Sequence, residues 1–308
     1  MSHGTKVWVA LGTVYVLWGS TYIGIAVVVE TLPPILSVSL RFLLAGALLA
    51  GWVLWRRGRG AFRVRPAEAV TAIAVGILLP SSNALLFLAQ RDVPSGLASL
   101  IIATVPLWVI VLGFTTGVRP TGAVLVGVLV GFAGVALLVR PGGNVGDATA
   151  LGLTLTVISS VTWAIGSYVS SRLSMPKDAF AATAIMMTAG GLFLLPIGLA
   201  VDPIDPGSWS IRSIVAFGYL VVFGSLVGYT AYVWLLANAP IGKVATYAYV
   251  NPVIAILLGA LILHERVTTT IMVGAAVIVA AVAIVVRRES PATVDPVAAG
   301  ASPPHEPR

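Results

Sequence analysis

Long apolar stretches, separated by short polar or charged segments, recur along almost the whole chain. One helix needs about 20 apolar residues to cross a bilayer core of about 30 Å. The pattern therefore predicts an all-α integral membrane protein with about ten transmembrane helices. The first half contains apolar stretches at Trp8–Val29, Pro34–Trp55, Ala69–Ala89, Gly96–Thr116 and Gly122–Val139. The second half contains stretches at Leu151–Leu173, Phe180–Val201, Ser213–Leu236, Lys243–His264 and Ile271–Val286.

The two halves share proline and glycine positions at one fixed spacing. Pro106 and Pro252 are 146 residues apart, and so are Gly113 and Gly259. Because each half holds an odd number of stretches, about five, the second half enters the membrane in the opposite sense. We therefore expect two inverted five-helix repeats, at 8–140 and 151–288, joined by a loop at 141–150. Residues 1–7 are expected to form an N-terminal tail, and the proline-rich residues 289–308 a disordered tail.

The positions of lysine and arginine predict how the chain is oriented. These residues concentrate on one set of alternating loops, above all in the segment Arg56–Arg65. Cytoplasmic loops of membrane proteins carry an excess of Lys and Arg. We therefore expect a multi-pass protein of the cell (inner) membrane with both termini in the cytoplasm.

Composition narrows the class of protein further. The chain is 58% hydrophobic and 9% charged, whereas a soluble domain is about a quarter charged, so much of its surface must face the lipid bilayer. The net charge of +7 lies in short patches between apolar stretches, which argues against nucleic acid as a partner. Cysteine is absent, which excludes disulfides and thiolate metal sites, and we expect no metal or cofactor.

Aromatic and polar residues lie deep within several predicted helices. Trp18 and Trp163 lie roughly ten to twelve residues into their stretches, away from the interfaces where lipid-facing aromatics gather. Asn251 immediately precedes Pro252, at a depth where an amide needs a partner. Packing between helices would satisfy such groups, and so would a substrate. We expect a substrate cavity lined by Trp18, Tyr22, Asn83, Trp163, Ser167, Tyr229, Tyr247 and Asn251.

Arg41 is the charged residue that lies clearly inside a predicted helix. It lies roughly 8–10 Å below the outer boundary, at 1.5 Å per residue, and a charge there is costly unless it meets water or an acceptor. A functional role for Arg41 would be contact with a substrate carboxylate or with a gate. The alternative is a side chain that extends to the outer headgroups.

Two further groups of residues suggest moving parts. Pro106 and Pro252 lack an N–H and each frees a carbonyl four residues earlier, which makes them hinge candidates or simple packing kinks. Glu30, His264 and Glu265 end helices on the outer side. They could carry protons or form a gate, and the alternative is that they anchor helix ends at the interface.

Several segments together resemble a known family. They are the opening VLWGSTYIGI, the Leu40-Arg41-Phe42 step, the segments VPSGLASLIIATVPL and ANAPIGKVATYAYVNPVIAILLG, and HERVT. Over about residues 8–288 the chain resembles the EamA family of the drug/metabolite transporter superfamily. Its members are similar to bacterial inner-membrane carriers that mostly export amino acids, related metabolites or drugs. The family's Gly-Glu-Arg-like step is kept as Glu265-Arg266 in the second half, but the first half has Gly117-Val118-Arg119.

These observations favour an alternating-access secondary transporter that exports small metabolites such as amino acids. A multidrug or toxic-compound exporter is the alternative within the same class. A membrane receptor and a membrane-embedded enzyme are the alternatives from other classes, but the three histidines lie in the tails or at an interface and no HExxH or GxSxG motif occurs. The expected partners are a small-molecule substrate and the lipid bilayer, and the chain is expected to act as a monomer or homodimer.

Overall fold

The computed structural model of the protein describes residues 1–117, 119–139, 148–239, 244 and 246–289. Across these ranges the chain is helical, with no β-strand. A π-helix, η3 (Leu220–Val227), joins α9 to α10, and short 3-10 turns occur at Arg59–Phe62 and Pro206–Ser208. The α-helices are α1 (His3–Val28), α2 (Pro34–Arg57), α3 (Pro66–Ala89), α4 (Ser95–Ile102), α5 (Val105–Thr115), α6 (Gly122–Val139), α7 (Ala150–Arg172), α8 (Ala179–Val201), α9 (Ile211–Tyr219), α10 (Gly228–Asn238), α12 (Tyr247–Ile262) and α13 (Thr269–Glu289).

Local sequence explains where several of these helices begin. Pro34 and Pro66 are the first residues of α2 and α3, a position where the missing N–H of proline has no cost. The side chains of Thr149 and Asp178 accept hydrogen bonds from backbone N–H groups in the first turns of α7 and α8. Such caps satisfy donors that have no partner within the helix.

The apolar stretches predicted the helices well, with three differences. The fourth stretch is two helices, because the chain turns at Ala103 and Thr104 between α4 and α5. The eighth stretch contains the π-helix η3 between two α-helices. The expected N-terminal tail is largely helical, since α1 begins at His3. Most of the expected inter-repeat loop lies outside the described residues, and so does the expected proline-rich tail 289–308 except for Glu289, which ends α13.

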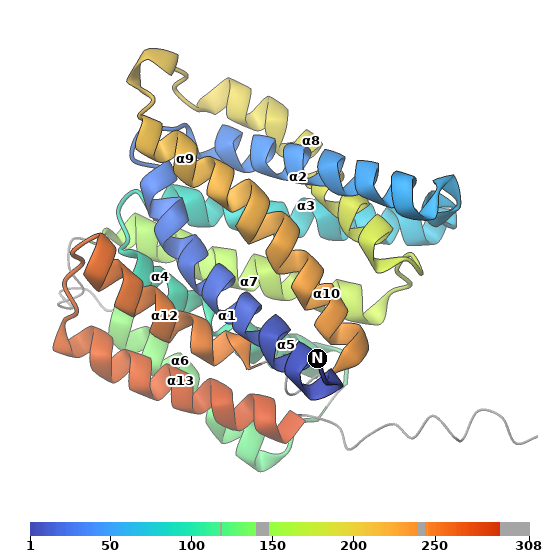
Figure 1. Ribbon diagram of the computed structural model, residues 1–308. Coiled ribbons are helices and arrows are strands. Elements are labelled where there is room, and N and C mark those ends of the chain that lie inside the picture. The colour runs from blue at the N-terminus through green and yellow to red at the C-terminus, as the bar shows by residue number, and fades with distance from the viewer. Residues whose placement is uncertain (118, 140–147, 240–243, 245, 290–308) are drawn as a thin grey trace, which may run out of the picture.

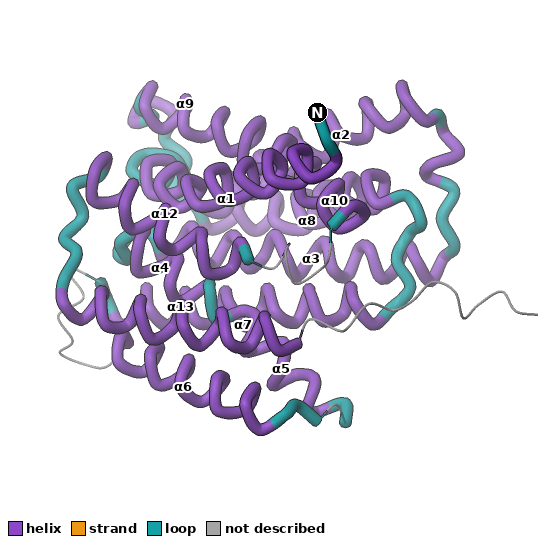
Figure 2. The backbone as a smooth tube through the Cα atoms, turned by 60° about the horizontal axis from the view of Figure 1, so that its bottom comes forward, coloured by secondary structure: helices purple, strands orange, loops and turns teal. Residues whose placement is uncertain are grey.

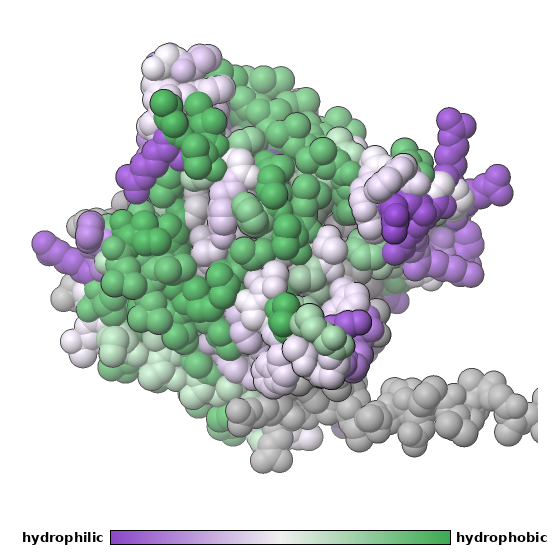
Figure 3. All heavy atoms as spheres, viewed as in Figure 1, coloured by the Kyte–Doolittle hydropathy of each residue, from purple (hydrophilic) through white to green (hydrophobic). Residues whose placement is uncertain are grey.

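The outer surface is apolar along the middle of the bundle. Within the described residues, 7 helical stretches are long and apolar enough to cross a membrane, and shorter apolar helices occur at Gly122–Leu138, Tyr247–Ile262 and Thr269–Val285. Large apolar side chains face outward on these helices, among them Leu48, Leu129, Leu192 and Leu257. Figure 3 shows this apolar band between two polar ends. The fold is therefore that of a multi-pass membrane protein.

Helix packing places α2 and α8 on one side of the bundle and α6 and α13 on the opposite side (Figures 1 and 2). Between them, α3 packs on α7, and α1 packs on α10 and α12. Glycines allow the closest approaches: a Cβ added at Gly190 of α8 would lie 2.1 Å from the Gly76 carbonyl oxygen of α3. Close backbone approach at small residues is the usual way in which membrane helices pack.

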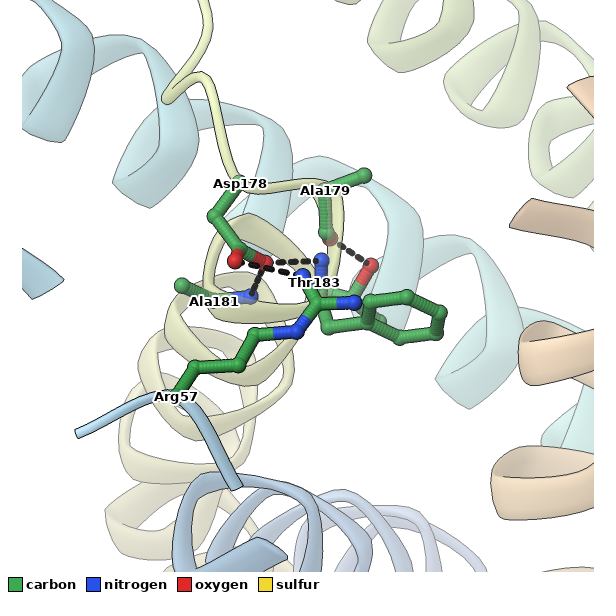
Figure 4. Close-up of polar contacts among 6 residues, drawn as sticks. Arg57, Asp178, Ala179, Ala181 and Thr183 are labelled. Atoms are coloured by element: carbon green, nitrogen blue, oxygen red, sulfur yellow. Dashed lines mark hydrogen bonds and ion pairs between the residues drawn. The ribbon is translucent and has the colours of Figure 1, made fainter. Parts of the chain in front are cut away.

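Polar contacts join α2 and α8 at both ends of the pair. At one end Arg57 Nη1 lies 2.5 Å from Asp178 Oδ2, and the guanidinium lies over the Phe180 ring at 4.7 Å (Figure 4). At the other end the Leu36 N–H donates to Asp202 Oδ2 at 2.7 Å. Burial raises the pKa of Asp178, but the hydrogen bonds from Arg57, Ala181 and Phe180 outweigh it and lower the pKa.

Candidate functional site

An internal cavity of about 120 Å³ lies at the centre of the bundle. Helices from both halves of the chain line it: α1 to α5 from the first half, and α7, η3, α10 and α12 from the second. The lining is mostly aromatic and apolar, with polar atoms at a few places. The lining residues that the sequence also indicated are Trp18, Tyr22, Arg41, Asn83, Pro106, Trp163, Tyr229, Tyr247, Asn251 and Pro252.

Arg41 lies inside the protein, in contrast to an arginine that extends to the headgroups. Its residue is 4% exposed, and its guanidinium lines the cavity. Arg41 Nε donates to Ser225 Oγ at 2.9 Å, and Ser225 belongs to the π-helix. Arg41 Nη1 is buried without a hydrogen-bond partner. The side chain is thus held by one nitrogen while another is free to bind a ligand.

Asn251 is the second polar group of the cavity wall that is incompletely paired. It is 7% exposed and lies on α12, one residue before Pro252. Its Oδ1 is buried without a partner. Buried polar atoms in proteins are almost always hydrogen-bonded. The free donor on Arg41 and the free acceptor on Asn251 belong to residues that line the same cavity.

Aromatic rings form one wall of the cavity. The Trp18 ring lies 5.5 Å from that of Tyr229 and 5.2 Å from that of Tyr247, measured between centroids. The Tyr232 ring, which is not part of the cavity lining, lies 5.0 Å from Trp18. Trp18 Nε1 donates to the Gly224 carbonyl at 3.3 Å, another contact to the π-helix.

The two prolines differ in their local structure. Pro106 follows the turn between α4 and α5 and lies in the first turn of α5, where its missing N–H leaves no gap. It therefore begins a helix, in contrast to the mid-helix kink that the sequence suggested. Pro252 lies inside α12, so the Ala248 carbonyl lacks its usual donor. Ala248 and both prolines line the cavity.

The remaining predicted residues lie away from the cavity. Ser167 is half-buried on α7, and its carbonyl accepts a hydrogen bond from Ser170. Glu30 is exposed and pairs with Arg212 at 3.4 Å. His264 is exposed and has a φ of 54°. Glu265 accepts hydrogen bonds from the N–H groups of Ser95 and Gly96 and so caps the N-terminus of α4.

Sequence reasoning missed a set of serines at the level of the cavity. Ser82 of α3 and Ser159 of α7 each donate to the carbonyl of the other, at 2.8 Å and 2.7 Å. Ser99 also lines the cavity, and Ser225 anchors Arg41. The signal that could have found Ser225 is its position beside Gly224 within an otherwise apolar stretch.

The apolar exterior and the long apolar helices define a multi-pass membrane protein, and its central cavity has a partly polar lining. The model of the EamA-like transporter family matches residues 6–140 and again residues 150–287, and the chain belongs to this family. It is 36% identical over 252 residues to the uncharacterized inner membrane transporter YedA of Escherichia coli (strain K12), covering 81% of this chain and 80% of that one.

Two further comparisons extend the picture. A protein of Escherichia coli (strain K12) named as a probable amino-acid metabolite efflux pump is 27% identical over 274 residues, covering 85% of this chain and 88% of that protein. A crystal structure of another protein superimposes with a TM-score of 0.63 at 21% identity, covering 92% of this chain and 96% of that one. The solved structure shares the fold.

Proposed function

We propose that this protein is an alternating-access secondary transporter that exports small carboxylate-bearing metabolites, such as amino acids, across the bacterial inner membrane. The observation that carries the proposal is the pair of buried, unpartnered atoms in one cavity, Arg41 Nη1 and Asn251 Oδ1. The names of two relatives, an inner membrane transporter and an amino-acid metabolite efflux pump, support it.

The chemistry of the cavity suits a zwitterion. A guanidinium binds a carboxylate through charge-assisted hydrogen bonds, which are among the strongest in proteins. An ammonium group can donate to the Asn251 amide oxygen and lie against the faces of Trp18 and Tyr247, where aromatic rings attract cations. The cavity of about 120 Å³ limits the solute to a small molecule.

Two inverted repeats of five helices would provide the moving parts. The family model matches the chain twice in succession, at residues 6–140 and 150–287. Helices at corresponding places pack on each other, α2 on α8, α4 on α12 and α6 on α13. The contact of α3 with α7 has its counterpart in the contact of α10 with α1. Rocking of one repeat against the other, with hinges near Pro106 and Pro252, would expose the cavity to either side in turn.

Topology provides a direct test of the inverted repeat. The positive segment Arg56–Arg65 predicts cytoplasmic termini and a cytoplasmic position for residue 60. Reporter domains fused at residues 60 and 145 should report opposite sides of the membrane. Reporters on the same side would contradict the inverted repeat, and the alternating-access mechanism with it.

Glu265 is the best candidate for a gate. Its carboxylate comes from the segment after α12 in the second half and caps α4 in the first half, at 2.7 Å from the Ser95 nitrogen. In the proposed orientation this contact closes the outer end of the bundle. Glu30 and His264 lie at the same end, and the pair of Glu30 with Arg212 crosses the same boundary between the halves. The described lining residues of the cavity all come from one chain, so a monomer would be sufficient for transport.

A multidrug exporter is the second candidate, because the aromatic wall of Trp18, Tyr229 and Tyr247 would also bind flat apolar cations. Untargeted mass spectrometry of the growth medium separates the two. Cells that express the wild type should accumulate carboxylate-bearing amines outside, and cells that express equal amounts of Arg41→Gln should not. Export of lipophilic cations by both, without any carboxylate, would favour the multidrug exporter and contradict the first proposal.

Cysteine mutagenesis tests the site itself, since the chain contains no cysteine. Single cysteines at Trp18, Trp163, Tyr247 and Asn251 should react with small water-soluble thiol reagents and be protected by the exported solute. A cysteine at Ser167, which lies outside the cavity lining, is the matched control and should show no protection by the solute.

A further inference from the structure

The cavity contains a positive charge, on Arg41, that no carboxylate among the described lining residues neutralises. The lining residues include Arg41 but no Asp or Glu among the described part of the chain. Described carboxylates outside the cavity have other contacts: Glu30 pairs with Arg212, Asp178 with Arg57, and Asp202 accepts from the Leu36 N–H. Asp92 accepts from Thr149, and Asp205 accepts from the Gly207 N–H. Glu265 caps α4 and Glu68 pairs with Arg65.

The immediate surroundings of Arg41 do not replace a counter-ion. The Ser225 hydroxyl is a neutral acceptor for Nε, and the Phe42 ring lies 5.3 Å from the guanidinium carbon. A Cβ added at Gly224 would lie 3.3 Å from Nη2, so the guanidinium packs directly against the π-helix. Nη1 remains without an acceptor. The guanidinium is held in place, and its remaining donor is available to an anion.

This charge affects every step in which the cavity closes. Alternating access passes through a state in which both sides are closed. A buried charge without a counter-ion is strongly disfavoured in a medium of low dielectric, and an opposite charge beside it removes most of that cost. A carrier that returns without a ligand would have to close around an unpaired guanidinium.

We infer that the carrier closes only around a bound monovalent anion at Arg41, and that it therefore exchanges anionic groups one for one in place of returning empty. The inference rests on the proposed function and adds its mode of coupling. The shared chemistry of the ligands is a single negative charge that accepts from Nη1. Its source on the return step is either the carboxylate of a second solute or a small inorganic anion such as chloride.

Anion binding to the purified protein tests the first half of the inference. Chloride and acetate should raise the thermal unfolding temperature in a saturable manner, since a ligand that binds the folded state stabilises it. Sulfate at equal ionic strength should give no saturable rise, because a single guanidinium pairs with only one of the two negative charges of sulfate. Arg41→Gln should lose the effect, and Arg59→Gln, which changes an exposed arginine, should keep it. An equal response of Arg41→Gln to chloride and acetate would overturn the inference.

Efflux from proteoliposomes tests the exchange. Vesicles are loaded with a radiolabelled mixture of alanine, serine and glutamine and diluted into chloride, unlabelled amino acids or sulfate. Efflux into sulfate should be at least roughly tenfold slower than into whichever of chloride and unlabelled amino acids gives the faster efflux. The reason is that the empty carrier would have to bury the unpaired charge. Faster efflux into chloride identifies the inorganic anion, and faster efflux into amino acids identifies the second carboxylate.

The two proposals fail in different ways. Equally fast efflux into all three media would overturn the exchange inference and leave the transport of amino acids intact. Retention of the label in every medium, while chloride still stabilises the purified protein through Arg41, would contradict the proposed substrate class and leave anion binding intact. A membrane potential offers a further distinction, since exchange of a zwitterion for chloride moves net charge and exchange of two zwitterions does not.

Discussion

Arg41 and Arg57 lie on the same helix, α2, roughly 24 Å apart along its axis at 1.5 Å per residue. Arg57 is at the end of the helix, with its side chain 40% exposed, and pairs with Asp178 of α8. Arg41 lies seven residues after the start of α2 and lines the central cavity; it is 4% exposed, with a serine as its acceptor and a free Nη1. The exposed arginine has a counter-ion although water would solvate it, and the buried one has none among the described residues of its cavity.

The difference separates a structural arginine from one that is available for binding. The pair of Arg57 with Asp178 joins two helices and completes a helix cap (Figure 4). Arg41 is positioned just as firmly, but its free donor lines a cavity that also contains the free acceptor of Asn251.

The largest effect is expected when the central arginine receives a carboxylate of its own. Asn251→Asp puts a negative charge into the cavity of Arg41, where it competes with the substrate carboxylate for the guanidinium. Transport of carboxylate-bearing solutes should fall roughly a hundredfold, at the upper end of the range for a charged hydrogen bond. Initial rates in vesicles measure the effect. Asn238→Asp, outside the central cavity, is the control, and wild-type rates in Asn251→Asp would show that position 251 does not affect the site.

A smaller effect is expected when Arg41 loses its anchor. Ser225→Ala removes the acceptor of Nε, so the guanidinium is no longer fixed toward the cavity. Apparent affinity should fall by about tenfold, equivalent to roughly 1.4 kcal/mol, and Ser225→Thr should restore most of it. Ser213→Ala removes another buried serine, which donates to the Val27 carbonyl at 2.6 Å. It should lower thermal stability without changing affinity, and a loss of affinity in Ser213→Ala equal to that in Ser225→Ala would make the role of Ser225 merely structural.

The smallest effect is expected at the paired arginine. Asp178→Asn should leave transport unchanged and lower stability by about 0–1 kcal/mol, since the Arg57 side chain is 40% exposed and water screens the pair. The lowered pKa of Asp178 means that its contribution is present at neutral pH and is lost as the pH falls through the folded-state pKa. Thermal unfolding of wild type and Asp178→Asn should therefore converge at low pH. A difference that grows as the pH falls would contradict this assignment.

Asp202, at the other end of the α2–α8 pair, should show the opposite pH dependence. Burial raises the pKa of Asp202, although the hydrogen bond from the Leu36 N–H opposes it. Ionisation of Asp202 therefore costs stability as the pH rises toward its folded-state pKa. Asp202→Asn retains an acceptor for the Leu36 N–H and should remove this loss, so its pH dependence should be opposite to that of Asp178→Asn.

Most helices and much of the cavity could be predicted from the sequence, because both follow from local signals. Apolar length predicts each membrane helix, and polar or aromatic side chains far from the interfaces, such as Trp18, Arg41 and Asn251, must face other protein groups or a ligand. The shared offset of Pro106 and Pro252 made both prolines candidates for hinges or packing kinks, and both line the cavity.

The remaining features depend on contacts between distant segments. The π-helix around Ser225 contacts distant segments: Trp18 of α1 donates to the Gly224 carbonyl, and Arg41 of α2 donates to the Ser225 hydroxyl. Ser167 shares a helix face with Trp163, but the cavity does not extend one turn further along α7. The cap that Glu265 provides for α4 joins residues 170 positions apart.

The most direct test of the account is the transport kinetics of Arg41→Lys beside those of Arg57→Lys, for a carboxylate-bearing amine that the wild type exports. Lysine keeps the charge but cannot hold Ser225 and a carboxylate at once as the guanidinium does. The account predicts that Arg41→Lys lowers apparent affinity roughly ten- to hundredfold at normal expression, and that Arg57→Lys behaves as the wild type. Near-normal transport by Arg41→Lys would contradict the central role of this arginine in binding the substrate.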